Sequence, residues 1–115
     1  MKKYCLVFEL KEEHIKDYVE LHKNCWPEHL KALKESGAKE LLIYNYKNLS
    51  ILFYECEDLD KHLQKLSEYQ INSKWQATVG PWFADKPNLD GTGGLEPLEK
   101  IFDLNEQLND QMSVK

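Results

Sequence analysis

The sequence predicts an α+β fold, a four-stranded antiparallel sheet with helices on one of its faces. The first observation is the order of the segments: strand, broken helix, strand, strand, broken helix, strand. The second is that the strand-like segments are apolar at both odd and even positions, which predicts that both faces of the sheet are covered. The third is length, because 115 residues suffice for one hydrophobic core and not for two.

The N-terminal segments are a predicted strand over residues 4–10 and a predicted helix over residues 11–21. Pro27 lacks an N–H and clashes with the carbonyl of the preceding turn, so a second helix over residues 28–35 should start anew there. Gly37 is a natural left-handed end for that second helix.

The middle of the chain contains a predicted hairpin. Residues 40–46 and 50–56 are apolar strands joined by a short turn at residues 47–49. Asp58 is a good N-cap for a following helix that ends near residue 69. Three leucines of that helix are expected to face inward: Leu59, Leu63 and Leu66.

The C-terminal third begins with a short helix that restarts at residue 72 and carries Trp75. Residues 84–94 form a long loop rich in Pro, Asn, Asp and Gly, which is therefore either functional or mobile. Residues 98–104 are the predicted last strand. The polar tail, residues 105–115, is expected to fray.

This order is the ferredoxin-like βαββαβ arrangement, in a single domain over residues 1–104. Helices cover only one face of such a sheet, whereas the strands are apolar on both. A second copy of the chain is the simplest cover for the other face. We therefore expect a homodimer whose sheets pack face to face, a dimeric α/β barrel.

The charge balance excludes some partners. The formal net charge is −5 and the pI is near 5.4, which argues against nucleic acid or an anionic membrane as a partner. The N-terminal apolar run ends at Glu9, too early for a signal peptide. Cys5, Cys25 and Cys56 are odd in number and far apart, which indicates reduced thiols in a cytoplasmic protein.

The stretch from residue 18 to residue 28 concentrates the candidate chemistry. Tyr18 and His22 lie on one helical face, one turn apart, and Trp26 continues that stripe to the break at Pro27. An imidazole both gives and takes a proton near neutral pH. From these residues alone, His22 is either a packing histidine or an acid–base catalyst.

The other histidines are less informative. His14 and His62 lie on charged helix faces and are predicted to be solvated. His22, Cys25 and His29 are spaced like metal ligands. However, the proline between them disrupts the helical register and no fourth ligand is near, so we expect no metal.

Trp75 adds a second aromatic wall. In this fold the two helical segments lie side by side on the sheet, so Trp26 and Trp75 are expected to border one cavity. Tryptophan rings pack against the apolar C–H face of a sugar, while His, Tyr and Glu side chains bond its hydroxyl groups. Glu28 is a candidate second acid–base group.

The sequence resembles the L-rhamnose mutarotase family over most of residues 1–104. The resemblance rests on three stretches: Tyr18-x-x-x-His22-x-x-x-Trp26-Pro27-Glu28, then Ser-Gly-Ala at 36–38 with Ile43-Tyr44, and Glu99-Lys-Ile-Phe102-Asp-Leu104.

This resemblance implies interconversion of the α and β anomers of a 6-deoxyhexopyranose, without cofactor or metal. It also implies that His22 is the proton donor and that Tyr18 binds the sugar. Two expected sugar contacts depart from the family: Leu41 replaces a tyrosine, and Trp75-Gln76 replaces a tryptophan pair. L-Rhamnose is the expected sugar, and L-fucose or another deoxysugar stays open.

Two other functions fit the same fold. Dimeric α/β-barrel monooxygenases or decarboxylase-type proteins share it, and fold alone does not separate them from a mutarotase. A non-catalytic ligand-binding module is the third hypothesis. A polar pocket next to His22 would favour the mutarotase, and a large apolar or haem-sized cavity the monooxygenase.

Overall fold

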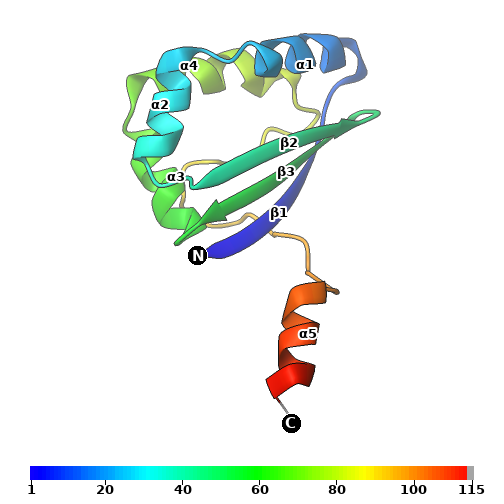
Figure 1. The fold of residues 1–115 in the computed structure, drawn as a ribbon. Coiled ribbons are helices and arrows are strands. Elements are labelled where there is room, and N and C mark those ends of the chain that lie inside the picture. Colours follow the sequence, from blue (N-terminus) through cyan, green and yellow to red (C-terminus); the bar gives the residue numbers. More distant parts are fainter. Residues whose placement is uncertain (114–115) are drawn as a thin grey trace.

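The computed structural model describes residues 1–113, which form one three-stranded antiparallel sheet with helices on one side (Figure 1). The strands are β1 (Lys2–Glu9), β2 (Glu40–Tyr46) and β3 (Leu49–Cys56), in the spatial order β1-β3-β2. The α+β class, the antiparallel pairing and the hairpin are therefore confirmed.

The helices of residues 15–79 are α1 (Ile15–Lys23), α2 (Pro27–Glu35), α3 (Leu59–Ser67) and α4 (Gln70–Val79). Short 3₁₀ turns, η1 (Glu12–His14) and η2 (Gly80–Trp82), precede α1 and follow α4. Figure 1 shows α1, α2 and α4 above the sheet and α3 beside its end. None of the helices in the described part of the chain is long and apolar enough to cross a membrane.

The prediction of a fourth strand over residues 98–104 is wrong. One backbone bond, from the N–H of Leu98 to the carbonyl of Cys5 at 2.8 Å, brings this segment beside β1. Beyond it, the Asp103 carboxylate accepts from the N–H of Glu106 at 3.0 Å and so caps a helix. The chain continues into α5 (Leu104–Ser113) instead of extending along the sheet.

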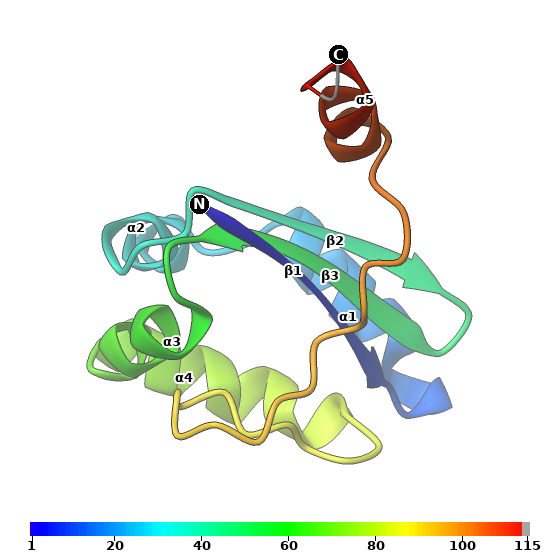
Figure 2. The same ribbon diagram turned by 90° about the horizontal axis from the view of Figure 1, so that it is seen from below.

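The tail, predicted to fray from residue 105, is therefore helical as far as Ser113, and residues 114–115 lie outside the described part. Figures 1 and 2 show α5 projecting away from the body of the protein, on the side of the sheet opposite the helices.

The helix break at Pro27 is confirmed. Pro27 occupies the first position of α2, where its missing N–H has no intrahelical role. The end at Gly37 is also confirmed, with φ +124°. There the N–H of Ala38 donates to the carbonyl of Leu33 at 3.1 Å, which closes a Schellman motif.

The α3 helix follows its predicted N-cap, since the Asp58 carboxylate accepts from the N–H of Lys61 at 3.1 Å. The inward leucines at 59, 63 and 66 are buried as predicted. The prediction that His62 is solvated is wrong, because this residue is only 3% exposed. His62 belongs to the same stripe, with the three- and four-residue spacing of a buried helix face. The predicted restart at residue 72 lies two residues too late, since α4 begins at Gln70.

The core divides into two clusters that meet at Phe8 and Ile43. One cluster joins the sheet to α3 and includes Leu52 and Leu63. The other joins α1 to α4 and includes Trp75. The opposite face of the sheet lacks such a cover in residues 1–113. Its exposed apolar side chains are Val7, Leu42, Tyr44, Tyr46 and Phe53.

The loop over residues 84–94 has no helix or strand, as predicted, but it is anchored. Gln64 of α3 donates to the carbonyl of Gly91 at 2.8 Å. Gly91 has φ +81°, and a Cβ there would lie 2.4 Å from the backbone oxygen of Asp60. Only glycine satisfies both the dihedral angle and the close approach.

We expect Gly91→Ala to destabilise the protein more than Gly93→Ala. Both glycines have positive φ, but a Cβ at Gly93 meets nothing within 4 Å. The strained dihedral angle alone should cost Gly93→Ala about 1 kcal/mol. The clash with α3 should cost Gly91→Ala a further 1–3 kcal/mol or so. Urea unfolding measures both, and equal losses would contradict the anchoring.

Candidate functional site

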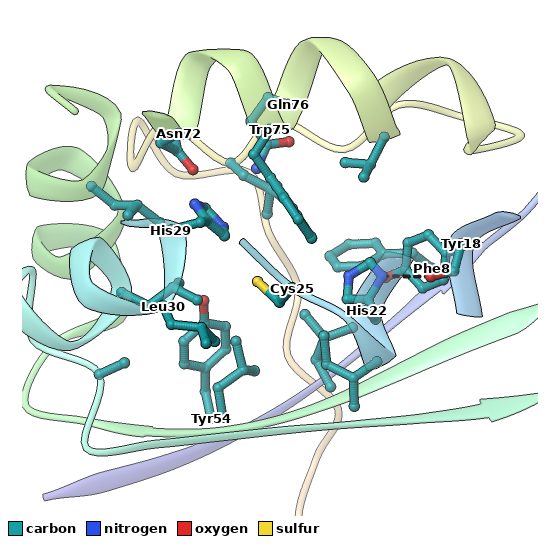
Figure 3. Close-up of a pocket in the computed structure, with 18 of the residues that line it drawn as sticks. Phe8, Tyr18, His22, Cys25, His29, Leu30, Tyr54, Asn72, Trp75 and Gln76 are labelled. Atoms are coloured by element: carbon teal, nitrogen blue, oxygen red, sulfur yellow. Dashed lines mark hydrogen bonds between the residues drawn. The ribbon is translucent and has the colours of Figure 1, made fainter. Parts of the chain in front are cut away.

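A cavity of about 670 Å³ opens between the helices and the core face of the sheet (Figure 3). Its volume lies within the roughly 300–1,000 Å³ usual for small-molecule sites. Its walls come from both core clusters, and Leu89 of the anchored loop contributes to them. Five of the predicted site residues line it: Tyr18, His22, Leu41, Trp75 and Gln76.

Trp26 and Glu28 are not among the lining residues. Trp26 lies behind the wall, edge to face with Trp75, with ring centroids 5.0 Å apart. Glu28 is on the exposed face of the first turn of α2. The structure thus brings most of the predicted site residues together, and it separates the Glu28 carboxylate from the cavity.

One hydrogen bond sets the protonation pattern of His22. Its Nδ1 lies 2.7 Å from the backbone carbonyl of Tyr18. A carbonyl only accepts, so Nδ1 carries the ring proton and Nε2 is left without one in the neutral ring. Burial lowers the pKa of His22 below 6.5, more than this hydrogen bond raises it. At neutral pH the side chain is therefore a base with a free Nε2.

Tyr18 supports this histidine from one turn earlier in α1. The two ring centroids are 4.0 Å apart, which restricts the imidazole. The Tyr18 hydroxyl lies 2.7 Å from the hydroxyl of Ser50 on β3. Burial raises the pKa of Tyr18, so its phenol stays protonated. Sequence reasoning missed Ser50, although strand alternation places it on the core face with Leu52.

Trp75 is the central wall of the cavity. Besides Trp26, it meets His22 edge to face at 5.2 Å and stacks on His29 at 4.5 Å with an interplanar angle of 14°. These rings come from α1, from α2 and from the residue before α2. Trp75 of α4 therefore contacts residues on both sides of the helix break.

Two polar side chains in the wall are buried without full hydrogen bonding. Nδ1 of His29 and Oδ1 of Asn72 have no partner among residues 1–113. An unpaired buried polar atom costs about 1–3 kcal/mol, so such a pair in a cavity wall calls for a functional explanation. Burial, and then the nearby His22, lower the pKa of His29 to about 4.

Tyr54 and Cys25 also line the cavity. Tyr54 reaches His62 behind the wall, with 3.3 Å between Oη and Nε2. Burial raises the pKa of Cys25, so it is a neutral thiol. In the described chain, no three His, Cys, Asp or Glu side chains are grouped to hold a metal ion.

Comparison with known proteins decides the family. A family model described as L-rhamnose mutarotase matches residues 3–104. The chain belongs to the L-rhamnose mutarotase family. Membership makes it an isomerase and confirms the resemblance carried by the Tyr18–Glu28 motif.

Individual members of this mutarotase family are distant relatives. The L-rhamnose mutarotase of Clostridium beijerinckii is 35% identical over 99 residues, which are 85% of this chain and 90% of that protein. The mutarotase of Oceanobacillus iheyensis is 29% identical over 107 residues, 91% of this chain and all of that protein. The Bacillus subtilis mutarotase is 26% identical over the same length and with the same coverage.

Solved structures agree on the fold of this mutarotase. The L-rhamnose mutarotase of Formosa agariphila matches with a TM-score of 0.67 at 23% identity, over 90% of this chain and 99% of that one. A Bordetella bronchiseptica protein named for antibiotic biosynthesis monooxygenases matches with a TM-score of 0.62 at 14% identity, over 87% and 96%. Both likenesses concern the fold alone.

The low pKa of His29 predicts acid sensitivity. The unfolded chain binds a proton at its ordinary pKa of 6.5, whereas folded His29 does so only at about 4. Its contribution to stability is therefore complete above pH 6.5 and is lost as the pH falls toward 4. The loss is up to about 3 kcal/mol. The free energy of unfolding of His29→Leu should fall less over this range, and parallel urea-unfolding curves would contradict the prediction.

Proposed function

We propose that this chain interconverts the α and β anomers of a 6-deoxyhexopyranose, with L-rhamnose as the first candidate and His22 as acid–base catalyst. The observation that carries the proposal is the hydrogen bond from His22 Nδ1 to the Tyr18 carbonyl. In a member of this family, that bond leaves a basic Nε2 on a histidine of the cavity wall.

The chemistry needs only proton transfers. Nε2 of His22 takes the proton of the anomeric hydroxyl while the C1–O5 bond breaks. The anomeric oxygen becomes the aldehyde oxygen, and O5 receives the electron pair of the broken bond. The imidazolium that has formed then gives its proton to O5. After rotation about the C1–C2 bond, the same steps in reverse close the ring on the other face.

The other lining residues have supporting roles in this proposal. Trp75 lines the cavity and offers apolar ring atoms to the C–H side of the sugar. Tyr18 restricts the imidazole through ring contact. The proton transfers do not use Glu28, whose side chain is exposed. These steps need no redox cofactor, because no electrons leave or enter the sugar.

Leu41 and Gln76 bear on the choice of sugar. Both line the cavity, and at Leu41 the hydroxyl that a tyrosine would supply is absent. A sugar that needs a hydrogen bond there binds less well, whereas one that presents a C–H group gains apolar contact. L-Fucose is the second candidate after L-rhamnose, because this lining departs from the family's at two expected sugar contacts.

We further propose a cytoplasmic homodimer. The open face of the sheet exposes Phe53 and Leu42, and Tyr44 lies beside them on β2. An apolar sheet face of this kind marks an interface, and a second copy covers it with matching chemistry. Cys5, Cys25 and Cys56 are free thiols, which fits a reducing compartment.

His22→Ala should lower the rate of anomer exchange by about 10²–10⁴-fold, the usual contribution of a general acid–base group. Tyr18→Phe keeps the ring contact and should lower it by less than about tenfold. Saturation-transfer NMR on L-rhamnose and L-fucose measures the exchange. His14→Ala is the matched control, because His14 does not line the cavity. If wild-type protein accelerates exchange of no deoxyhexose, the proposed function fails.

Phe53→Glu places a charge within the open apolar face and should convert the dimer to a monomer, as measured by sedimentation velocity. Leu30→Glu is the control, since Leu30 is exposed to a similar extent on the helical side. A wild-type protein that sediments as a monomer at micromolar concentration would contradict the dimer.

A further inference from the structure

A chain of hydrogen bonds runs from the cavity to the end of α2. The Tyr54 hydroxyl lies 3.3 Å from Nε2 of His62, and Nδ1 of His62 lies 3.2 Å from Oγ of Ser36. All three side chains are less than 10% exposed: 7% for Tyr54, 3% for His62 and 5% for Ser36. None of them takes part in the proton transfers at His22.

The direction of these bonds follows from the serine. Ser36 Oγ lies 2.7 Å from the carbonyl of Ala32 and 3.1 Å from that of Leu33, and carbonyls only accept. The single serine proton therefore goes to them, and Oγ accepts from Nδ1–H of His62. A buried neutral His62 carries one ring proton, so its Nε2 is bare and accepts from the Tyr54 hydroxyl. The Tyr54 oxygen can then only accept further bonds.

The unpartnered polar atoms lie at the same end of the cavity. His29 and Asn72 are 3% and 4% exposed, and each has one polar atom without a partner. In Figure 3 the Tyr54 hydroxyl points toward the region where His29 and Asn72 lie, and His22 is at the other end. Oη of Tyr54 and Oδ1 of Asn72 are both acceptors, which suits a ligand that presents O–H donors.

We propose that Tyr54, Asn72 and His29 form a second polar subsite that binds the sugar hydroxyl groups farthest from the anomeric carbon. The inference rests on the proposed function, which places the anomeric carbon at His22. In a pyranose, C3 and C4 lie across the ring from O5 and C1. Their hydroxyls are the donors that this subsite receives.

The spacing of the two ends agrees with this orientation. His22 and His29 both contact the same Trp75 ring, so one indole separates the catalytic end from the second subsite. An indole is similar in size to a pyranose. A pyranose in the cavity is therefore long enough to reach both ends at once, and the subsite makes the choice among sugars that differ at C3 or C4.

Tyr54→Phe tests the proposal by removing one hydroxyl. The KM for L-rhamnose should rise about 3- to 10-fold, the usual effect of one neutral hydrogen bond, with kcat within twofold of wild type. For wild type, the KM should rise by the same factor when L-rhamnose is replaced by one of its two analogues, the 3-deoxy or the 4-deoxy sugar. For that analogue, Tyr54→Phe should cause no further rise in KM. Tyr4→Phe is the matched control, because Tyr4 pairs with Tyr54 across the strands and does not line the cavity.

An unchanged KM for L-rhamnose in Tyr54→Phe, or an equal rise for L-rhamnose and both analogues, would overturn the subsite. A wild-type protein without anomer exchange refutes the proposed function instead. In that case, the binding affinities of the wild-type protein for the same three sugars, measured by calorimetry, test the subsite. Equal affinities for the three sugars, or no binding, would overturn it.

The role of His62 as a positioning residue has its own spectroscopic readout. In ¹⁵N-histidine-labelled protein, NMR should show His62 with its proton on Nδ1. A proton on Nε2 would mean that Tyr54 accepts from His62 and offers its own proton to the cavity. That result would overturn the assignment of Tyr54 as an acceptor.

Discussion

The packing of the Trp75 ring is the interaction on which the site depends. Its neighbours His22, Trp26 and His29 come from both sides of the helix break at Pro27. Aromatic pairs at these separations are each worth about 0.5–1.5 kcal/mol beyond burial. The contacts join α1, α2 and α4 through one ring that also lines the cavity.

Two histidines near this cavity hold the same tautomer for different reasons. The Tyr18 carbonyl fixes His22, and Ser36 fixes His62. In each case Nδ1 donates to an oxygen and Nε2 is left bare. What Nε2 meets differs. At His22, no group among residues 1–113 forms a hydrogen bond with Nε2, and the ring lines the cavity, which suits proton transfer. At His62 it accepts the Tyr54 hydroxyl, which suits the orientation of a neighbour.

Side chains alternate between the two faces of the sheet, and the helices cover only one of these faces. Along β3, Leu52 and Tyr54 are buried under the helices, while Phe53 between them is exposed. Both sets are apolar, so the sheet carries more hydrophobic surface than its own helices cover. This excess is the physical basis of the proposed dimer.

Much of the fold could be predicted from local chemistry. Pro27, Gly37 and Asp58 end or begin helices because of their own backbone and side-chain properties, and these breaks are where they were expected. The motif from Tyr18 to Glu28 likewise led to the family, and most of the predicted site residues line the cavity.

The tertiary structure decided what depends on contacts between distant segments. A strand exists only with a partner along its length, and residues 98–104 form one bond with β1 before Asp103 starts a helix. The burial of His29 and His62 and the pairing of Tyr18 with Ser50, 32 residues away, follow from how helices pack on the sheet. A polar residue has the same local sequence signal whether a neighbouring helix covers it or leaves it exposed. For this reason the sequence by itself determined the breaks, the alternation and the motif, and only packing decided which polar groups enclose the cavity.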